Sequence, residues 1–101
     1  MILAFVVDLM DRSRITAALD DVRFVRTVDP AVEPVPTVVI VDLSRYGGVV
    51  PEVRAAWPHS TVVGFGPHVD DAAMEAARAD GADRVLARSV FFRDITAALG
   101  R

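Results

Sequence analysis

The sequence predicts an α/β domain built on a doubly wound, five-stranded parallel sheet, and three observations lead to this prediction. Two apolar runs without polar alternation, Ile2–Val7 and Thr37–Val41, are typical of strands covered by helices on both faces. Each run ends in an aspartate, Asp8 or Asp42. Segments typical of helices alternate with the strands, which favours right-handed crossovers and a parallel sheet.

The length and composition of the chain argue against several classes of protein. The chain has 101 residues, 52% of them hydrophobic, so we expect one domain over residues 1–101. No apolar run approaches the roughly 20 residues that a membrane helix needs. Cysteine is absent, which excludes disulfides and thiol catalysis. The net charge is -3 without a basic stripe, so nucleic acid is not an expected partner. The start of the chain carries no secretory pattern, and we expect a cytoplasmic protein.

The first half of the chain is expected to form a helix and an edge strand after the first buried strand. Asp11 or Ser13 can cap a helix that runs to about Leu19 with one apolar stripe. The segment Val22–Val28 alternates apolar and charged residues, which is typical of an outer strand with one wet face.

A proline-rich connector follows. The segment Asp29–Pro36 holds three prolines, and proline is excluded from helix interiors. The helix that would normally join the second and third strands is therefore expected to be shortened or absent. After the third strand, residues 44–48 contain two glycines and are expected to form a loop.

The second half repeats the alternation of helices and strands. Gly81 follows the clearest helix pattern at a position that favours left-handed backbone. The expected elements are a short helix Pro51–Ala56, a strand Thr61–Phe65, a helix Ala72–Asp80 capped by Asp70 or Asp71, a strand Ala82–Ala87 and a helix Val90–Leu99.

The predicted strand order is 2-1-3-4-5, in which Asp8 and Asp42 meet at the carboxyl edge of the sheet. Ligands of open α/β sheets bind at this edge, where the strand order reverses. Two converging carboxylates repel each other, and a bound divalent cation, a raised pKa or a nearby arginine can relieve the repulsion.

This pattern resembles the receiver domain of two-component response regulators, over almost the whole chain and least over residues 29–36. The segment Gly81–Asp83 before the last strand matches the family as well. The resemblance implies a flavodoxin-like fold. It also implies that Asp8 is one of two magnesium-binding acids and that Asp42 is the phosphoacceptor.

The chain departs from the family pattern at several positions, so we interpret it as degenerate. Leu9 stands where the second acid of the pair should be, and Asp11 is a further acid at a different spacing. Gly66 occupies the Thr/Ser position, and Arg88 occupies the lysine position, followed by Ser89 in place of proline. If these acids are structural, we expect Asp42 to cap the loop that follows it or to pair with the planar guanidinium of Arg88, and Asp8 to cap the first helix region.

Other candidate sites have weaker support. Gly47-Gly48 and Gly64-x-Gly66 lack the spacing of a phosphate-binding loop. His59 and His68 are expected to be solvated. Trp57 and the pair Phe91-Phe92 are expected to pack in the core rather than to anchor a partner.

The favoured function is a non-catalytic, receiver-like signalling or protein-interaction module without a cofactor. It would act through a protein partner or a homodimer, because no output domain follows Arg101. The alternative is a working single-domain response regulator, phosphorylated at Asp42 with magnesium. A second alternative is a small enzyme that uses the edge formed by Asp8 and Asp42.

Overall fold

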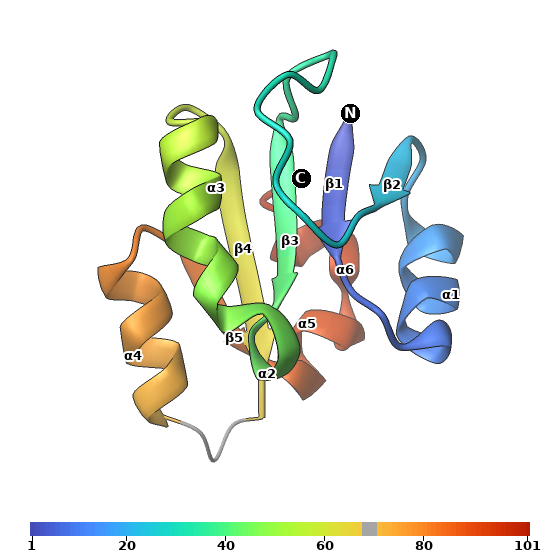
Figure 1. Ribbon diagram of the computed structural model, residues 1–101. Coiled ribbons are helices and arrows are strands. Elements are labelled where there is room, and N and C mark those ends of the chain that lie inside the picture. Colours follow the sequence, from blue (N-terminus) through green and yellow to red (C-terminus); the bar gives the residue numbers. More distant parts are fainter. Residues whose placement is uncertain (68–70) are drawn as a thin grey trace.

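Five parallel strands form one sheet in the order β2-β1-β3-β4-β5, as predicted (Figure 1). The computed structural model describes residues 1–67 and 71–101. His68 and Asp70 lie outside the described residues, so the predictions for them are not addressed. The strands are β1 (Ile2–Phe5), β2 (Val22–Phe24), β3 (Val38–Asp42), β4 (Thr61–Gly66) and β5 (Arg84–Ala87).

Helices cover both faces of the sheet. The α1, α5 and α6 helices pack on one face, and α3 and α4 pack on the other (Figure 1). The helical elements are α1 (Leu9–Ala18), α2 (Leu43–Tyr46), the 3₁₀ helix η1 (Gly47–Val49), α3 (Val50–Ala56), α4 (Asp71–Ala79), α5 (Arg88–Arg93) and α6 (Ile95–Ala98). No helix within residues 1–67 and 71–101 has the length and apolar character to cross a bilayer.

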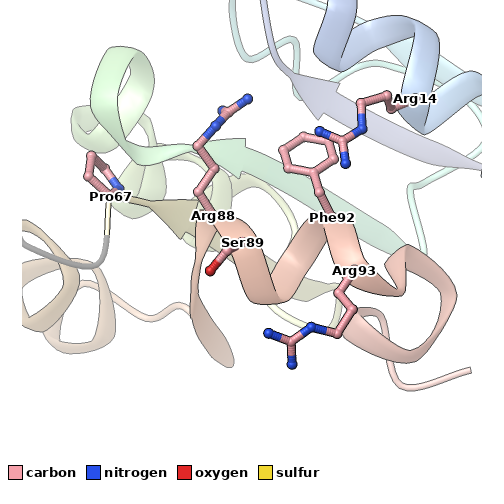
Figure 2. A pocket seen from close by; sticks show the side chains of 6 residues that line it. All are labelled: Arg14, Pro67, Arg88, Ser89, Phe92 and Arg93. Atoms are coloured by element: carbon pink, nitrogen blue, oxygen red, sulfur yellow. The ribbon is translucent and has the colours of Figure 1, made fainter.

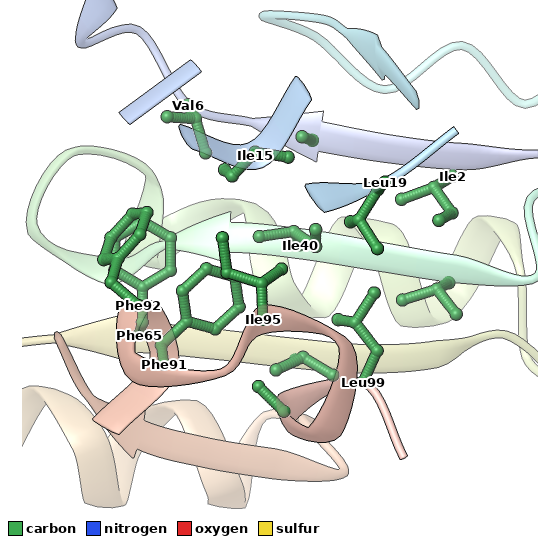
Figure 3. Packing of buried hydrophobic residues seen from close by; sticks show 14 residues of the cluster. Ile2, Val6, Ile15, Leu19, Ile40, Phe65, Phe91, Phe92, Ile95 and Leu99 are labelled. Carbon is green, nitrogen blue, oxygen red and sulfur yellow. The ribbon is translucent and has the colours of Figure 1, made fainter. Parts of the chain in front are cut away.

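The buried strands divide the core into two clusters because successive side chains point to opposite faces. Ile2, Ala4 and Val6 join the cluster under α1, α5 and α6, which Figure 3 shows. Leu3 and Phe5 join the cluster under α3 and α4. The expectation that the larger aromatic residues are core residues is confirmed, with exposed fractions of 2% for Trp57, 0% for Phe91 and 9% for Phe92.

The connector between β2 and β3 contains no helix over residues 25–37, all of which are described. This confirms the prediction drawn from its prolines. The outer strand β2 is shorter than expected and ends at Phe24. Gly81 has the expected left-handed backbone after α4, with φ of 112°.

Three expectations about helices are wrong. The first helix begins at Leu9 and is capped by Asp8, whose Oδ1 accepts the N–H of Asp11 at 2.9 Å, so neither Asp11 nor Ser13 is the cap. Residues 44–48 form α2 and part of η1 instead of a loop. The last helix is broken at Asp94, which has extended backbone and caps α6 by accepting the N–H of Ala97.

Candidate functional site

The carboxyl edge of the sheet gathers the positions that the sequence singled out. Asp42 is the last residue of β3 and lies in register with Phe65, next to Gly66 at the end of β4. Gly66 in turn lies in register with Ala87, which Arg88 follows. Asp8 lies between β1 and α1 and is exposed. This edge therefore brings Asp42, Gly66 and Arg88 together, whereas Asp8 caps α1 beyond the end of β1.

Asp11 and Arg88 form the central contact of this edge. Arg88 donates from Nη1 to Asp11 Oδ2 at 2.8 Å and from Nη2 to Asp11 Oδ1, which makes a two-pronged ion pair. The Asp11 side chain is 4% exposed, whereas the Arg88 side chain is 44% exposed. The expected hydrogen-bonded pairing of Arg88 with Asp42 is wrong, because α1 begins early enough to bring Asp11 to the guanidinium.

Asp42 is buried, with an exposed fraction of 5%. Its Oδ1 accepts the N–H of Ser44 at 3.0 Å and so caps α2. Burial raises the pKa of Asp42, and the nearby charge of Asp11 adds to this rise. The hydrogen bond from Ser44 and the positive charges of Arg88 and Arg45 lower the pKa, but they do not cancel the effect of burial.

Arg88 is influenced by all three acids of the edge. Its pKa is raised first by the hydrogen bond to Asp11, and then by the negative charges of Asp11, Asp42 and Asp8. Of the three ways to relieve repulsion between the carboxylates, the structure therefore shows two, a nearby arginine and a raised pKa. Arg88 also lies 4.9 Å from the ring centroid of Phe92, within the range of a cation–π contact.

Gly66 leaves the end of β4 without a hydroxyl, and the surroundings there leave room for a Cβ. A Cβ added to Gly66 would meet Leu43 Cβ at 3.6 Å, which is ordinary van der Waals contact. At Gly64, a Cβ would meet Leu43 Cδ2 at 2.9 Å. The two glycines therefore differ, since a Cβ at position 64 would force the Leu43 side chain to shift, whereas a Cβ at position 66 would not.

The acids of this edge do not fit magnesium, the ion that the resemblance implies. Magnesium prefers octahedral oxygen coordination. Both oxygens of Asp11 accept hydrogen bonds from Arg88, and one oxygen each of Asp8 and Asp42 accepts a backbone N–H. Across residues 1–67 and 71–101, no three His, Cys, Asp or Glu side chains are grouped in a way that could hold a metal ion.

The contact that sequence reasoning missed is the pair Asp11–Arg88. The sequence holds a signal for the start of the helix but not for the pair itself, because Asp8 stands three residues before Asp11, the spacing at which a capping side chain accepts an N–H. A helix that starts after Asp8 places Asp11 in its first turn.

Comparison with known proteins supports the fold. No protein-family model matches the chain. No curated protein matches it either. Three solved structures are similar to it, each with a TM-score above 0.7.

The first is a response regulator from Burkholderia pseudomallei, solved with a phosphorylated aspartic acid, a calcium ion and citrate, with a TM-score of 0.74 and 18% identity. The match covers 97% of this chain but only 64% of that protein. A response regulator from Thermotoga maritima has a TM-score of 0.74 and 12% identity, with 99% of this chain and 97% of that one covered. A CheY-like response regulator from Mesorhizobium loti has a TM-score of 0.71 and 21% identity, with 98% and 94% covered. The chain thus has the fold of a response-regulator receiver domain.

Proposed function

We propose that this chain is a receiver-like signalling or protein-interaction module that does not use phosphoryl transfer at Asp42. The observation that carries the proposal is the ion pair between Arg88 and Asp11. A guanidinium supplies the positive charge at an edge where the resemblance implies a divalent cation and a lysine. The module then needs neither magnesium nor another cofactor.

The state of Asp42 supports the same proposal. Phosphoryl transfer to an aspartate requires an accessible, ionised carboxylate as the nucleophile. Asp42 is buried, its pKa is raised, and one of its oxygens accepts the N–H of Ser44. Gly66 adds no hydroxyl that could contact a phosphoryl group.

The alternative, a working receiver phosphorylated at Asp42 with magnesium, has one observation in its favour. The similar protein from Burkholderia pseudomallei carries a phosphorylated aspartic acid and a calcium ion in a structure of the same fold. For this chain to work in that way, Arg88 would have to release Asp11 when a cation binds.

A phosphorylation assay distinguishes the two functions. The protein is incubated with acetyl phosphate and magnesium, and phosphoaspartate is measured by intact-mass spectrometry. We expect the wild type to remain unmodified, like its Asp42→Asn variant. Stoichiometric labelling of the wild type that is lost in Asp42→Asn would refute the proposal and establish the alternative.

A gain-of-function variant tests the proposal from the opposite direction, by restoring the residues of the family pattern. Leu9→Asp, Gly66→Thr and Arg88→Lys together introduce the acid, hydroxyl and ammonium of the family pattern, and Gly66 has space for a side chain. We expect this triple variant to become labelled, and the addition of Asp42→Asn to abolish the label. The matched control is Arg23→Lys, because Arg23 is exposed on β2.

The proposed module acts through other proteins in the cytoplasm, and a homodimer is one form that it can take. Val90 on α5 is a large apolar residue that is 42% exposed, in keeping with a contact surface. Light scattering at micromolar concentration tests the homodimer, and a monomer at every concentration would exclude it.

A further inference from the structure

A pocket of about 550 Å³ lies between α1 and α5, beside the edge described above (Figure 2). Arg14 comes from α1, Pro67 follows β4, and the other lining residues belong to α5. The pocket is lined by Arg14, Pro67, Arg88, Ser89, Phe92 and Arg93. Its volume falls within the range of about 300–1,000 Å³ that is typical of small-molecule sites.

The lining has a strong positive charge. Three of its six side chains are guanidinium groups, and none is a carboxylate. Arg88 is already engaged with Asp11, but neither Arg14 nor Arg93 forms an ion pair with any residue of 1–67 and 71–101. Two exposed guanidiniums are therefore available to an added anion.

Phe92 restrains two of the three guanidinium groups, those of Arg14 and Arg88. The guanidinium of Arg14 lies 4.5 Å from the centroid of the Phe92 ring, and that of Arg88 lies 4.9 Å from it. The ring itself is fixed by edge contacts with Phe65 and Phe91. Arginine side chains that are restrained in this way lose less conformational entropy when they bind a ligand.

An adjoining hollow of about 450 Å³ shares Arg14, Phe92 and Arg93 with the pocket. It also contains Asp94, the only carboxylate in its lining, whose Oδ1 accepts the N–H of Ala97 at the start of α6. Together the two hollows give room for a ligand larger than an inorganic ion.

We propose that this pocket binds a small organic anion, namely a carboxylate or phosphate group carried on an apolar body. Guanidinium groups bind planar carboxylates and phosphates through paired, charge-assisted hydrogen bonds, and Arg14 and Arg93, whose guanidinium groups point in different directions (Figure 2), can each supply one such pair. Pro67 and Phe92 supply apolar contact for the body of the ligand, and Ser89 supplies a hydroxyl. The proposal does not depend on the role of Asp42, because Asp42 is not in the lining.

Titrations followed by ¹⁵N–¹H NMR test the proposal with three probes: phenyl phosphate, benzoate and inorganic phosphate. Phenol, which has the same ring without the charge, is the neutral control. We expect saturable shifts in the amides of residues 12–16 and 88–93 with phenyl phosphate or benzoate. The stronger of these two identifies the anionic group, and inorganic phosphate should bind more weakly because it lacks the ring.

Charge-neutral variants test Arg14 and Arg93, which form no ion pair within residues 1–67 and 71–101. Arg14→Gln and Arg93→Gln should each weaken binding about tenfold, the loss expected for one charge-assisted hydrogen bond. Arg23→Gln removes the same charge from exposed β2 and should leave the affinity unchanged. Circular dichroism confirms the fold of each variant. The proposal would be overturned if the anionic probes gave no saturable shifts or if phenol bound as well as they do. It would also be overturned if all three variants bound the probes with equal affinity.

Discussion

Removal of the Arg88 side chain tests the central contact of the edge. Arg88→Ala leaves the carboxylate of Asp11, 4% exposed, without its two hydrogen-bond donors. Breaking a fully buried ion pair costs about 3–5 kcal/mol, and an unsatisfied buried polar group about 1–3 kcal/mol. Because the Arg88 side chain is 44% exposed, water can replace part of the interaction. We therefore expect a loss of about 2 kcal/mol in the free energy of unfolding.

The assay is thermal and urea unfolding followed by circular dichroism. A loss of this size lowers Tm by roughly 10 °C in a domain of this length. Arg14→Ala is the matched control, because it also removes a guanidinium from the ring of Phe92 but breaks no ion pair among the described residues. If Arg88→Ala destabilises the protein no more than Arg14→Ala does, the ion pair is not what stabilises this edge.

Asp11 is more deeply buried than Arg88, so the variants of the two residues should differ in stability, which provides a second test. Asp11→Asn leaves unpaired only the more exposed partner, Arg88, which water can solvate. It should therefore cost less than Arg88→Ala, and the double variant should recover part of the loss of Arg88→Ala. A double variant whose loss equals the sum of the two single losses would show that the residues are not coupled.

Three further predictions concern other parts of the fold. Burial raises the pKa of Asp42 above 3.8. The contribution of Asp42 to the free energy of unfolding should therefore fall as the pH rises above 3.8 and the buried carboxyl ionises. Asp42→Asn retains the capping group, so its free energy of unfolding relative to wild type, measured with urea, should be higher at about pH 7 than at about pH 3. A higher relative value at about pH 3 would contradict the raised pKa. Gly64→Ala, whose Cβ meets Leu43 at 2.9 Å, should lose about 1–3 kcal/mol, and Gly66→Ala clearly less; equal melting temperatures would count against this packing. Gly81→Ala should lose about 1–2 kcal/mol because φ is 112° there, and an unchanged Tm would contradict that backbone strain.

The sheet could be predicted from the sequence because its signals are local. Ile2–Val7 and Thr37–Val41 are continuous apolar runs, and a strand buried on both faces requires this pattern. That Asp8 and Asp42 both follow strands ending at the same edge then results from the parallel topology alone. The prolines of the connector likewise act locally, since each one is incompatible with a helix interior.

The pairing within the edge could not be predicted in the same way. Asp11 and Arg88 are 77 residues apart, and their contact depends on the residue at which α1 begins. Asp8 and Asp11 are both good capping residues, so composition did not decide between them. The choice of Asp8 moves Asp11 into the first turn of the helix, where it is buried against the sheet edge.

The helix after β3 was missed for a related reason. Gly47 and Gly48 favour a loop by composition, but Gly47 has helical backbone, with φ of -52° and ψ of -37°. Leu43 is buried and lies against Gly64, which fixes the start of α2. Tertiary packing therefore overrides the weak local preference of the glycines.

The departures from the receiver pattern at positions 9, 66 and 88 depend on one another physically. The charge of Arg88 already compensates Asp8, Asp11 and Asp42, so another acid at Leu9 would add repulsion that one guanidinium does not offset. A lysine at position 88 would replace the two parallel hydrogen bonds to Asp11 with the contact of a single ammonium. A hydroxyl at Gly66 alone would leave the ion pair between Arg88 and Asp11 in place. From the proposed function we expect each single reversion to leave the edge without phosphoryl transfer, and only the combined change to replace the guanidinium with an arrangement that a cation can complete.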